Sequence, residues 1–223
     1  MDHQPRPGIC PQKRGRDRLI RLAQARPDWA LGFLDEVWWS RVARPRMASW
    51  ADENAPLRLV EQTVARTDPD PKALACYGLL MRAWKAAGKR EEEMLLRFVD
   101  GRPVSDITTQ FLNWCCARLA AQGKTALLLV WDNASWHISK AVRTWITAHN
   151  RTVKQRGEGV RIVACHLPSK SPWLNPIEPK WRHSKHWIIE PSRLLSAEEI
   201  AVRVCASFGC VHEPHLMVIE EVS

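Results

Sequence analysis

Two short apolar segments, each carrying an acidic residue, constrain the fold more than any other feature of the sequence. Residues 29–41 read WALGFLDEVWWSR, and residues 125–133 read TALLLVWDN. Short, nearly continuous apolar runs are typical of buried strands. An ionised carboxylate in such a strand is unfavourable unless it is paired or binds a cation. The sequence therefore predicts two buried strands whose acids, Asp35 and Asp132, have a specific role.

Strands and helices alternate in the predicted order, which is typical of an α/β fold. In such a sheet, functional groups gather at the carboxyl ends of strands, where Asp132 is expected. Ser105 is a candidate N-cap for one helix, and Gly123 is a candidate terminator of the same helix. The predicted elements are a basic helix at 13–26, a strand at 29–41, a loop and strand within 49–62, strands at 74–84 and 93–101 that complete an antiparallel meander, a helix at 105–124, a strand at 125–133, a helix at 140–157, a strand at 160–167 and a helix begun by Glu178.

The segment SPWLNPIEPKW, residues 171–181, places Glu178 in a proline-rich turn. Asn175 is a favourable helix N-cap, Pro176 fits the first helical position, and Glu178 follows the cap by three residues. One interpretation is a capping box, in which the Glu178 side chain bonds to the Asn175 backbone N–H. The other is a chemical role for this carboxylate, and the segment alone leaves both open.

Asp35, Asp132 and Glu178 can meet at one edge of the sheet. They are separated by 97 and 46 residues, which leaves room for the predicted strands and helices between them. Three convergent carboxylates form a hard-oxygen site of the kind that suits Mg²⁺ or Mn²⁺.

The motifs around these acids resemble a known family. FLDE, VWDNASWH and LPSKSPWLNPIEPKW together are similar to the catalytic domain of DDE transposases of the mariner superfamily, in its bacterial insertion-sequence branch. The resemblance extends from about Lys13 to about Leu195, and S-P-x-L-N-P-I-E-P-x-W is its most specific motif. It implies an α/β fold of the ribonuclease H-like type, a mixed sheet flanked by helices. It also implies that Asp35, Asp132 and Glu178 are the catalytic metal ligands.

The chemistry implied by this resemblance is phosphoryl transfer with two Mg²⁺ or Mn²⁺ ions, bridged by Asp35 and held by Asp132 and Glu178. The family acts on double-stranded DNA: it cleaves the ends of an element and joins the freed 3′-hydroxyl to a target, usually at a TA dinucleotide. The active form is expected to be a homodimer in the bacterial cytoplasm.

The charge of the chain agrees with a nucleic-acid partner. Lys and Arg number 33 against 24 Asp and Glu, which gives a net charge of +9 and favours a polyanion. No run approaches the roughly 18 apolar residues of a membrane span, and the N-terminus lacks the apolar core of a secretion signal. We therefore expect a cytosolic protein without a membrane partner.

One domain is the simplest division of residues 1–223: a DDE catalytic domain with a short basic N-terminal helix and a C-terminal helical tail. Members of the family carry a helix-turn-helix region ahead of the first aspartate, whereas 34 residues precede Asp35. We therefore expect this region to be absent. The alternatives to an active transposase are a truncated product that regulates by binding DNA or transposase, and a purely hydrolytic nuclease of the same fold.

Basic and aromatic residues near the acidic motifs are candidate DNA contacts, through phosphates or by base stacking. Glu36 is expected to point to the opposite face of its strand from Asp35. His137 and His183 are candidates for proton transfer or DNA contact, although satisfied surface histidines are the simpler interpretation. The candidate DNA-binding residues are Arg41, Arg44, Lys170, Trp173, Lys180, Arg182 and Lys185.

Seven cysteines without paired spacing suit a reducing compartment. The segment CASFGCVHEPH contains Cys205, Cys210, His212 and His215, which are the ligand types of a zinc site. Their spacing matches no standard zinc motif. Ordinary core cysteines at the end of a helix are therefore the favoured interpretation, with a structural zinc site as the alternative.

Overall fold

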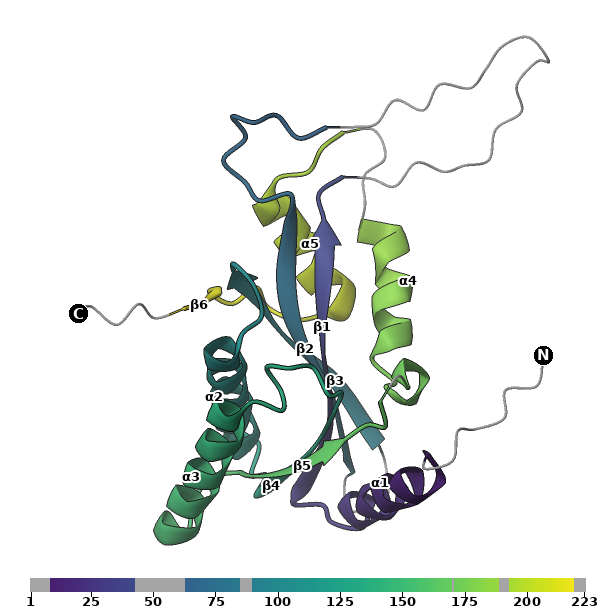
Figure 1. The fold of residues 1–223 in the computed structure, drawn as a ribbon, viewed down its shortest axis with the longest axis vertical. Coiled ribbons are helices and arrows are strands. Elements are labelled where there is room, and N and C mark those ends of the chain that lie inside the picture. The colour runs from purple at the N-terminus through teal and green to yellow at the C-terminus, as the bar shows by residue number, and fades with distance from the viewer. Residues whose placement is uncertain (1–8, 43–62, 85–89, 170, 189–192, 219–223) are drawn as a thin grey trace, which may run out of the picture.

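A six-stranded mixed sheet in the order β5-β4-β1-β2-β3-β6 organises the chain (Figure 1). The structure is a computed structural model that describes residues 9–42, 63–84, 90–169, 171–188 and 193–218. The strands are β1 Trp29–Ser40, β2 Ala73–Trp84, β3 Arg90–Asp100, β4 Ala126–Trp131, β5 Arg161–His166 and β6 Leu216–Met217. The helices are α1 Ile9–Gln24, α2 Ser105–Ala121, α3 Lys140–Arg156, α4 Glu178–Ile188 and α5 Ala197–Phe208, with a 3-10 helix at Pro172–Leu174.

The central strand β1 joins the two halves of the sheet. It pairs antiparallel with β2, which pairs antiparallel with β3, so the predicted meander is confirmed. On its other side β1 pairs in parallel with β4, and β4 pairs in parallel with β5. Asp132 directly follows β4, so it stands at the carboxyl end of a parallel strand as predicted.

Alternate residues of the strands point to opposite faces of the sheet, and each face has its own hydrophobic core. Leu31, Phe33 and Val37 of β1 belong to the core that includes side chains of α1, α4 and α5. Ala30 and Leu34 of the same strand belong to the core formed with α2 and α3. Because both faces are covered, the strands tolerate the nearly continuous apolar sequence that predicted them. The two groups of helices lie on either side of the sheet in Figure 1.

The structure corrects one predicted helix cap. Val104, and not Ser105, is the N-cap of α2, because Ser105 is already helical and its hydroxyl bonds to the Ser139 hydroxyl at 2.9 Å. Ser139 in turn caps α3, since its side chain accepts the Val142 N–H. Gly123 follows the C-cap of α2 in the left-handed conformation, with φ of 73°, as its predicted role requires.

The C-terminal segment is predicted to be helical, but only part of it is. After α5 the chain extends, and Leu216–Met217 forms β6 beside β3 in parallel. The predicted strand within 49–62 lies outside the described residues. In the described part of the chain, no helix is long and apolar enough to cross a membrane.

Candidate active site

Asp35 lies near the middle of β1, on the face covered by α4. The indole N–H of Trp181, from α4, donates a hydrogen bond of 3.0 Å to its carboxylate. Trp181 is buried and packs edge-on against Trp39. Gly78 stands opposite Asp35 on β2, and a Cβ atom at Gly78 would overlap the Trp181 ring. The absence of a side chain at Gly78 thus allows the indole to reach and orient the carboxylate.

The surroundings of Asp35 favour its neutral form. Burial is the main cause that raises the pKa of Asp35 to about 8. The negative charges of Glu178, Glu36 and Asp132 act on this pKa in the same direction. A carboxyl group placed among other carboxylates becomes stable when it binds a proton or when a cation joins the group.

Asp132 is held by a histidine bridge. Its carboxylate accepts the Ala134 backbone N–H at 2.9 Å and lies 2.8 Å from His137 Nδ1. The other ring nitrogen of His137, Nε2, lies 2.7 Å from a Glu36 carboxylate oxygen. His137 is buried, with 1% of its surface exposed, so the expectation of a surface histidine is wrong. His137 thus connects Asp132 to Glu36, the residue next to Asp35.

The surroundings of the bridging histidine favour its protonated form. Burial alone would lower the pKa of His137, but its hydrogen bonds to Asp132 and Glu36 outweigh burial and raise the pKa to about 9. The hydrogen bond from His137 correspondingly lowers the pKa of Asp132, which therefore stays ionised. Asp35 bonds to Trp181 on one face of the sheet, and Glu36 meets His137 on the α3 side. The prediction that Glu36 points away from Asp35 is thus confirmed.

Glu178 begins α4, as predicted, but not through the expected capping box. The Asn175 backbone N–H donates to the Pro172 carbonyl at 2.8 Å, so it is not bonded to Glu178. The Asn175 side chain is buried and donates to the Leu34 carbonyl at 3.1 Å, which ties the loop to β1 next to Asp35. In the part of the chain that the structure describes, no group donates a hydrogen bond to the Glu178 carboxylate.

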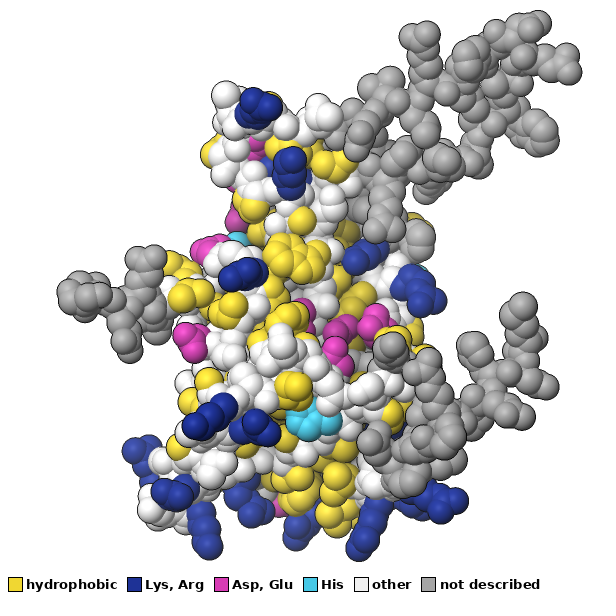
Figure 2. Space-filling view, in the orientation of Figure 1, with side chains coloured by type: hydrophobic (Ala, Val, Ile, Leu, Met, Phe, Trp, Pro, Cys, Tyr) yellow, Lys and Arg dark blue, Asp and Glu magenta, His cyan; other side chains and the backbone are white. Residues whose placement is uncertain are grey.

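All three acids line one cavity of about 320 Å³. Asp35 contributes from the sheet, Asp132 from the loop after β4, and Glu178 from the start of α4. Asn133 and Asn175 add polar groups to the same wall. Figure 2 shows acidic side chains gathered near the centre of the displayed face.

The donor set of this cavity fits a hard divalent cation. Carboxylate oxygens are the protein ligands that Mg²⁺ and Mn²⁺ prefer, and these two ions keep several water or substrate ligands. The three acids do not form a preorganised metal site. Among the described residues, no three His, Cys, Asp or Glu side chains are close enough together to hold a metal by themselves. Burial, followed by the negative charges of Glu178, Glu36 and Asp132, raises the pKa of Asp35, so a positive charge beside this carboxyl group would favour its ionised form.

Comparison with protein families places the site in a known context. A family model described as DDE superfamily endonuclease matches residues 33–201, a segment that contains all three acids. The chain belongs to this family of DDE endonucleases. No curated protein matches the chain significantly.

Several solved structures share the fold of this DDE endonuclease. One is the Mos1 transposase paired-end complex with left transposon end, at 17% identity and a TM-score of 0.59, covering 94% of this chain and 57% of that chain. A second is the Mos1 mariner paired end complex with Mn, at 18% identity and a TM-score of 0.54, with 94% and 57% covered. The fold is therefore of the ribonuclease H-like type, as predicted. The chain spans a little over half the length of these transposases.

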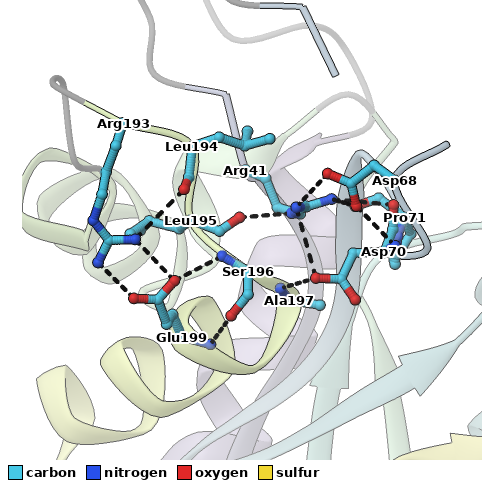
Figure 3. Close-up of polar contacts among 10 residues, drawn as sticks. All are labelled: Arg41, Asp68, Asp70, Pro71, Arg193, Leu194, Leu195, Ser196, Ala197 and Glu199. Atoms are coloured by element: carbon cyan, nitrogen blue, oxygen red, sulfur yellow. Dashed lines mark hydrogen bonds and ion pairs between the residues drawn. The ribbon is translucent and has the colours of Figure 1, made fainter. Parts of the chain in front are cut away.

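Arg41 is predicted to contact DNA, but the structure does not support this prediction. Its side chain is buried and bonded to other groups of the fold (Figure 3). The guanidinium donates to both carboxylate oxygens of Asp68, at 3.0 and 2.9 Å. It also donates to the Leu195 carbonyl at 2.7 Å and lies 3.6 Å from the Asp70 carboxylate. Arg41 thus fastens the segment before β2 to the segment before α5.

The other candidate DNA contacts have different surroundings. Trp173 is 68% exposed in the turn beside Glu178, where it is available for stacking. Lys180 is exposed but lies 2.8 Å from Glu92, and Lys185 lies over the Trp39 ring. Arg182 and His183 are exposed. Arg44 and Lys170 lie outside the described residues.

The candidate zinc residues do not converge. Cys210 bonds through its thiol to the Cys205 carbonyl, and His215 bonds to Asp100 at 2.6 Å. His212 lies 3.2 Å from His215 through their Nε2 atoms, and both rings pack against Phe98. The described residues contain no group of three ligands that could hold a metal. The favoured interpretation, cysteines packed at a helix end, agrees with this arrangement.

Sequence reasoning missed the residues that orient the acids. The strand pattern places Glu36 on the face opposite Asp35, the simpler interpretation of His137 is a surface histidine, and no sequence pattern assigns Trp181 to Asp35. The spacing WH directly after DNAS was the available signal, because a histidine five residues beyond an aspartate can fold back onto it in a turn. The partnership of Trp181 with Gly78 depends on how α4 packs on β2, which no local pattern encodes.

Proposed function

We propose that the chain is the catalytic domain of a metal-dependent DNA transposase of the mariner superfamily, in its bacterial insertion-sequence branch. It would cleave the ends of an element and join the 3′-hydroxyl to target DNA. The observation that carries the proposal is that Asp35, Asp132 and Glu178 line one cavity within the segment matched by the DDE endonuclease family. The Mos1 complexes described as a paired-end complex and a strand transfer complex support it through their shared fold.

The proposed cofactors are two Mg²⁺ or Mn²⁺ ions held by Asp35, Asp132 and Glu178. When bound, such ions activate water or a 3′-hydroxyl and stabilise the leaving oxygen. Mos1 paired end complexes with Mn and with Mg support this part of the proposal. The other residues of the chain provide orientation: Trp181 fixes the Asp35 carboxylate, and His137 fixes that of Asp132.

The proposed partners are double-stranded DNA, as element end and as target, and a second copy of the chain in the active state. Residues 1–223 would act as a single catalytic domain in the bacterial cytoplasm. Trp173, Lys180, Arg182 and Lys185 flank Glu178 and are proposed to contact DNA at the cavity.

The test is a joining reaction with matched variants. The full chain is incubated with Mn²⁺, a supercoiled plasmid and a pre-cut, labelled duplex that ends in the inverted repeat flanking the coding sequence. The wild type is expected to join the labelled strand to the plasmid. Glu178→Gln and Asp132→Asn should each reduce joining by at least about 100-fold, because an amide lacks the charge that holds the cation.

Glu158→Gln is the matched control, since Glu158 is an exposed carboxylate in the turn after α3. It should join as the wild type does. Equal joining by Glu178→Gln and the wild type would refute the proposal. Mn²⁺-dependent cleavage without joining would instead identify a hydrolytic nuclease.

A further inference from the structure

The outward face of α3 carries cations without acids. Between Asp132 and Glu178 the sequence contains seven Lys or Arg residues and one acidic residue, Glu158. Six of these cations are described, and all six side chains are exposed. None of the six has an acidic or carbonyl partner among the described residues. Five of them form what we call the α3 basic face: Lys140, Arg143, Arg151 and Lys154 on α3, and Arg161 at the start of β5.

The α3 basic face is a continuous hollowed surface. One hollow of about 380 Å³ is lined by Lys140, Arg143 and Arg151, together with Thr144 and Thr147. A second hollow of about 430 Å³ is lined by Arg151, Lys154 and Arg161, again with Thr147. Because the two hollows share Arg151 and Thr147, they run into one another along the helix. Dark blue side chains cover this part of the molecule at the lower left of Figure 2, where Figure 1 places α3.

The stability of the helix does not explain this arrangement. Cations near a helix N-terminus are unfavourable, because that end of the helix dipole is positive. The first turn of α3 nevertheless contains Lys140 and Arg143 and no acid. These two residues are also spaced by three positions, as are Arg151 and Lys154, so like charges lie next to each other on the helix surface. By contrast, α5 begins with Glu198 and Glu199.

Several cations elsewhere in the described chain pair with acids of the fold. Arg41 pairs with Asp68, and Arg82 pairs with Glu92. Arg118 lies 3.1 Å from Glu213 although both side chains are partly exposed. The cations of the α3 basic face have no such acidic partners among the described residues, and their combined charge is complementary to an external polyanion.

We propose that the α3 basic face binds the phosphate backbone of duplex DNA that enters the cavity. The inference rests on the proposed function, since it names a surface by which that DNA would be held. Lys140 begins α3, and the loop that leads from Asp132 to this helix contains the cavity-lining residues Asn133 and Ala134. From Lys140 to Lys154 the helix rises about 21 Å at 1.5 Å per residue. That length matches the rise of roughly six nucleotides along one strand.

The experiment measures binding separately from chemistry. Fluorescence anisotropy of a labelled 20-base-pair duplex is recorded with the full chain in EDTA, from 50 to 200 mM NaCl. The test variant is the triple substitution Arg143→Gln, Arg151→Gln and Lys154→Gln. The matched control has the same change in charge at Arg66, Lys72 and Arg90, which are also exposed. Circular dichroism and the Tm verify that both variants are folded.

The wild type is expected to bind in a salt-dependent manner, and the test variant to lose at least about tenfold in affinity at 100 mM NaCl, with a salt slope that is smaller by about two to three. The control should lose less than about threefold. Equal losses in test and control, or no duplex binding by the wild type at 50 mM NaCl, would overturn the inference. Since EDTA removes the metal, a chain that binds through this face but joins no DNA would refute the proposed function alone.

Discussion

The Arg41 cluster and the cavity are two charged regions of the same sheet whose carboxylates differ in how they are paired. Around Arg41, a buried cation is surrounded by Asp68, Asp70 and a carbonyl, so each charge has a partner within the fold. Around the cavity, Asp35 and Glu178 share a space with Asp132, and His137 is the cation bonded to that group. The first region is complete as a structure. In the cavity, a bound cation would supply the positive charge that the carboxylates lack. This is how a cation-binding site differs from a structural network.

The largest effect on stability is expected in the Arg41 cluster. Arg41→Met should lower the free energy of unfolding by roughly 3–5 kcal/mol, because it leaves the partly buried carboxylates of Asp68 and Asp70 and the Leu195 carbonyl without their partner. Urea unfolding measures this change. Arg66→Met, an exposed site in the same segment, should change stability by no more than about 0.5 kcal/mol. If both variants unfold alike, the Arg41 network is not structural and the comparison fails.

In the histidine bridge, the charge of His137 is expected to compensate the carboxylates of Asp132 and Glu36. His137→Phe keeps a ring that can stack on Trp131 but leaves Glu36, with 9% of its side chain exposed, without a cation. We expect a loss of about 3 kcal/mol in unfolding free energy. Adding Glu36→Gln should recover part of that loss, since the uncompensated charge is removed. Additive effects of the two substitutions in urea unfolding would show that the bridge carries no coupling.

Asp35→Asn is expected to stabilise the metal-free protein. At pH 8 the substitution removes a carboxyl whose ionisation opposes folding, while the amide oxygen can still accept the Trp181 N–H. The gain in unfolding free energy should be about 1–2 kcal/mol in EDTA. Saturating Mn²⁺ should reverse the order of stability, because only the wild type has the ligand. A destabilised Asp35→Asn protein in EDTA would mean that the carboxylate is already balanced.

The pH dependence of the metal-free protein tests the same imbalance on a smaller scale. The pKa of Asp35 is about 8 when folded, against 3.8 in the unfolded chain, and that of His137 is about 9 against 6.5. Between pH 6.5 and 8 both groups hold a proton in the folded state that they release on unfolding, so stability must fall as pH rises. We expect a fall of about 1 kcal/mol per pH unit for each group. Urea unfolding across this range should give a shallower slope for Asp35→Asn, and a flat wild-type profile would contradict the shifts.

Most of the elements, and the positions of Asp35, Asp132 and Glu178 on them, could be predicted because local patterns determine them. The apolar runs at β1 and β4 predict buried strands in any context, and Asp132 follows from where the second run ends. Gly123 could be predicted because a left-handed residue at a helix end favours glycine. These features depend on a few adjacent residues.

The network that orients the acids could not be predicted, because it depends on packing between distant segments. Trp181 reaches Asp35 only because β2 presents Gly78 at the crossing point. Arg41 was read as a surface cation because its partners, at Asp68 and Leu195, are far along the chain. The capping box failed for a similar reason: the Asn175 N–H had a nearer acceptor in Pro172, and its side chain was drawn to β1.

The central claim is that Asp35, Asp132 and Glu178 act together as a cation site. The most direct test is a Mn²⁺ titration of the wild type and of Glu178→Gln, followed by electron paramagnetic resonance of free Mn²⁺ and by the Tm. The two proteins should have the same Tm in EDTA within about 1 °C, because the Glu178 carboxylate accepts no hydrogen bond from the described residues that the amide would lose. The wild type should bind Mn²⁺ saturably and gain Tm, and the variant should bind at least about tenfold more weakly. Equal Mn²⁺ affinity in the two proteins would contradict the account.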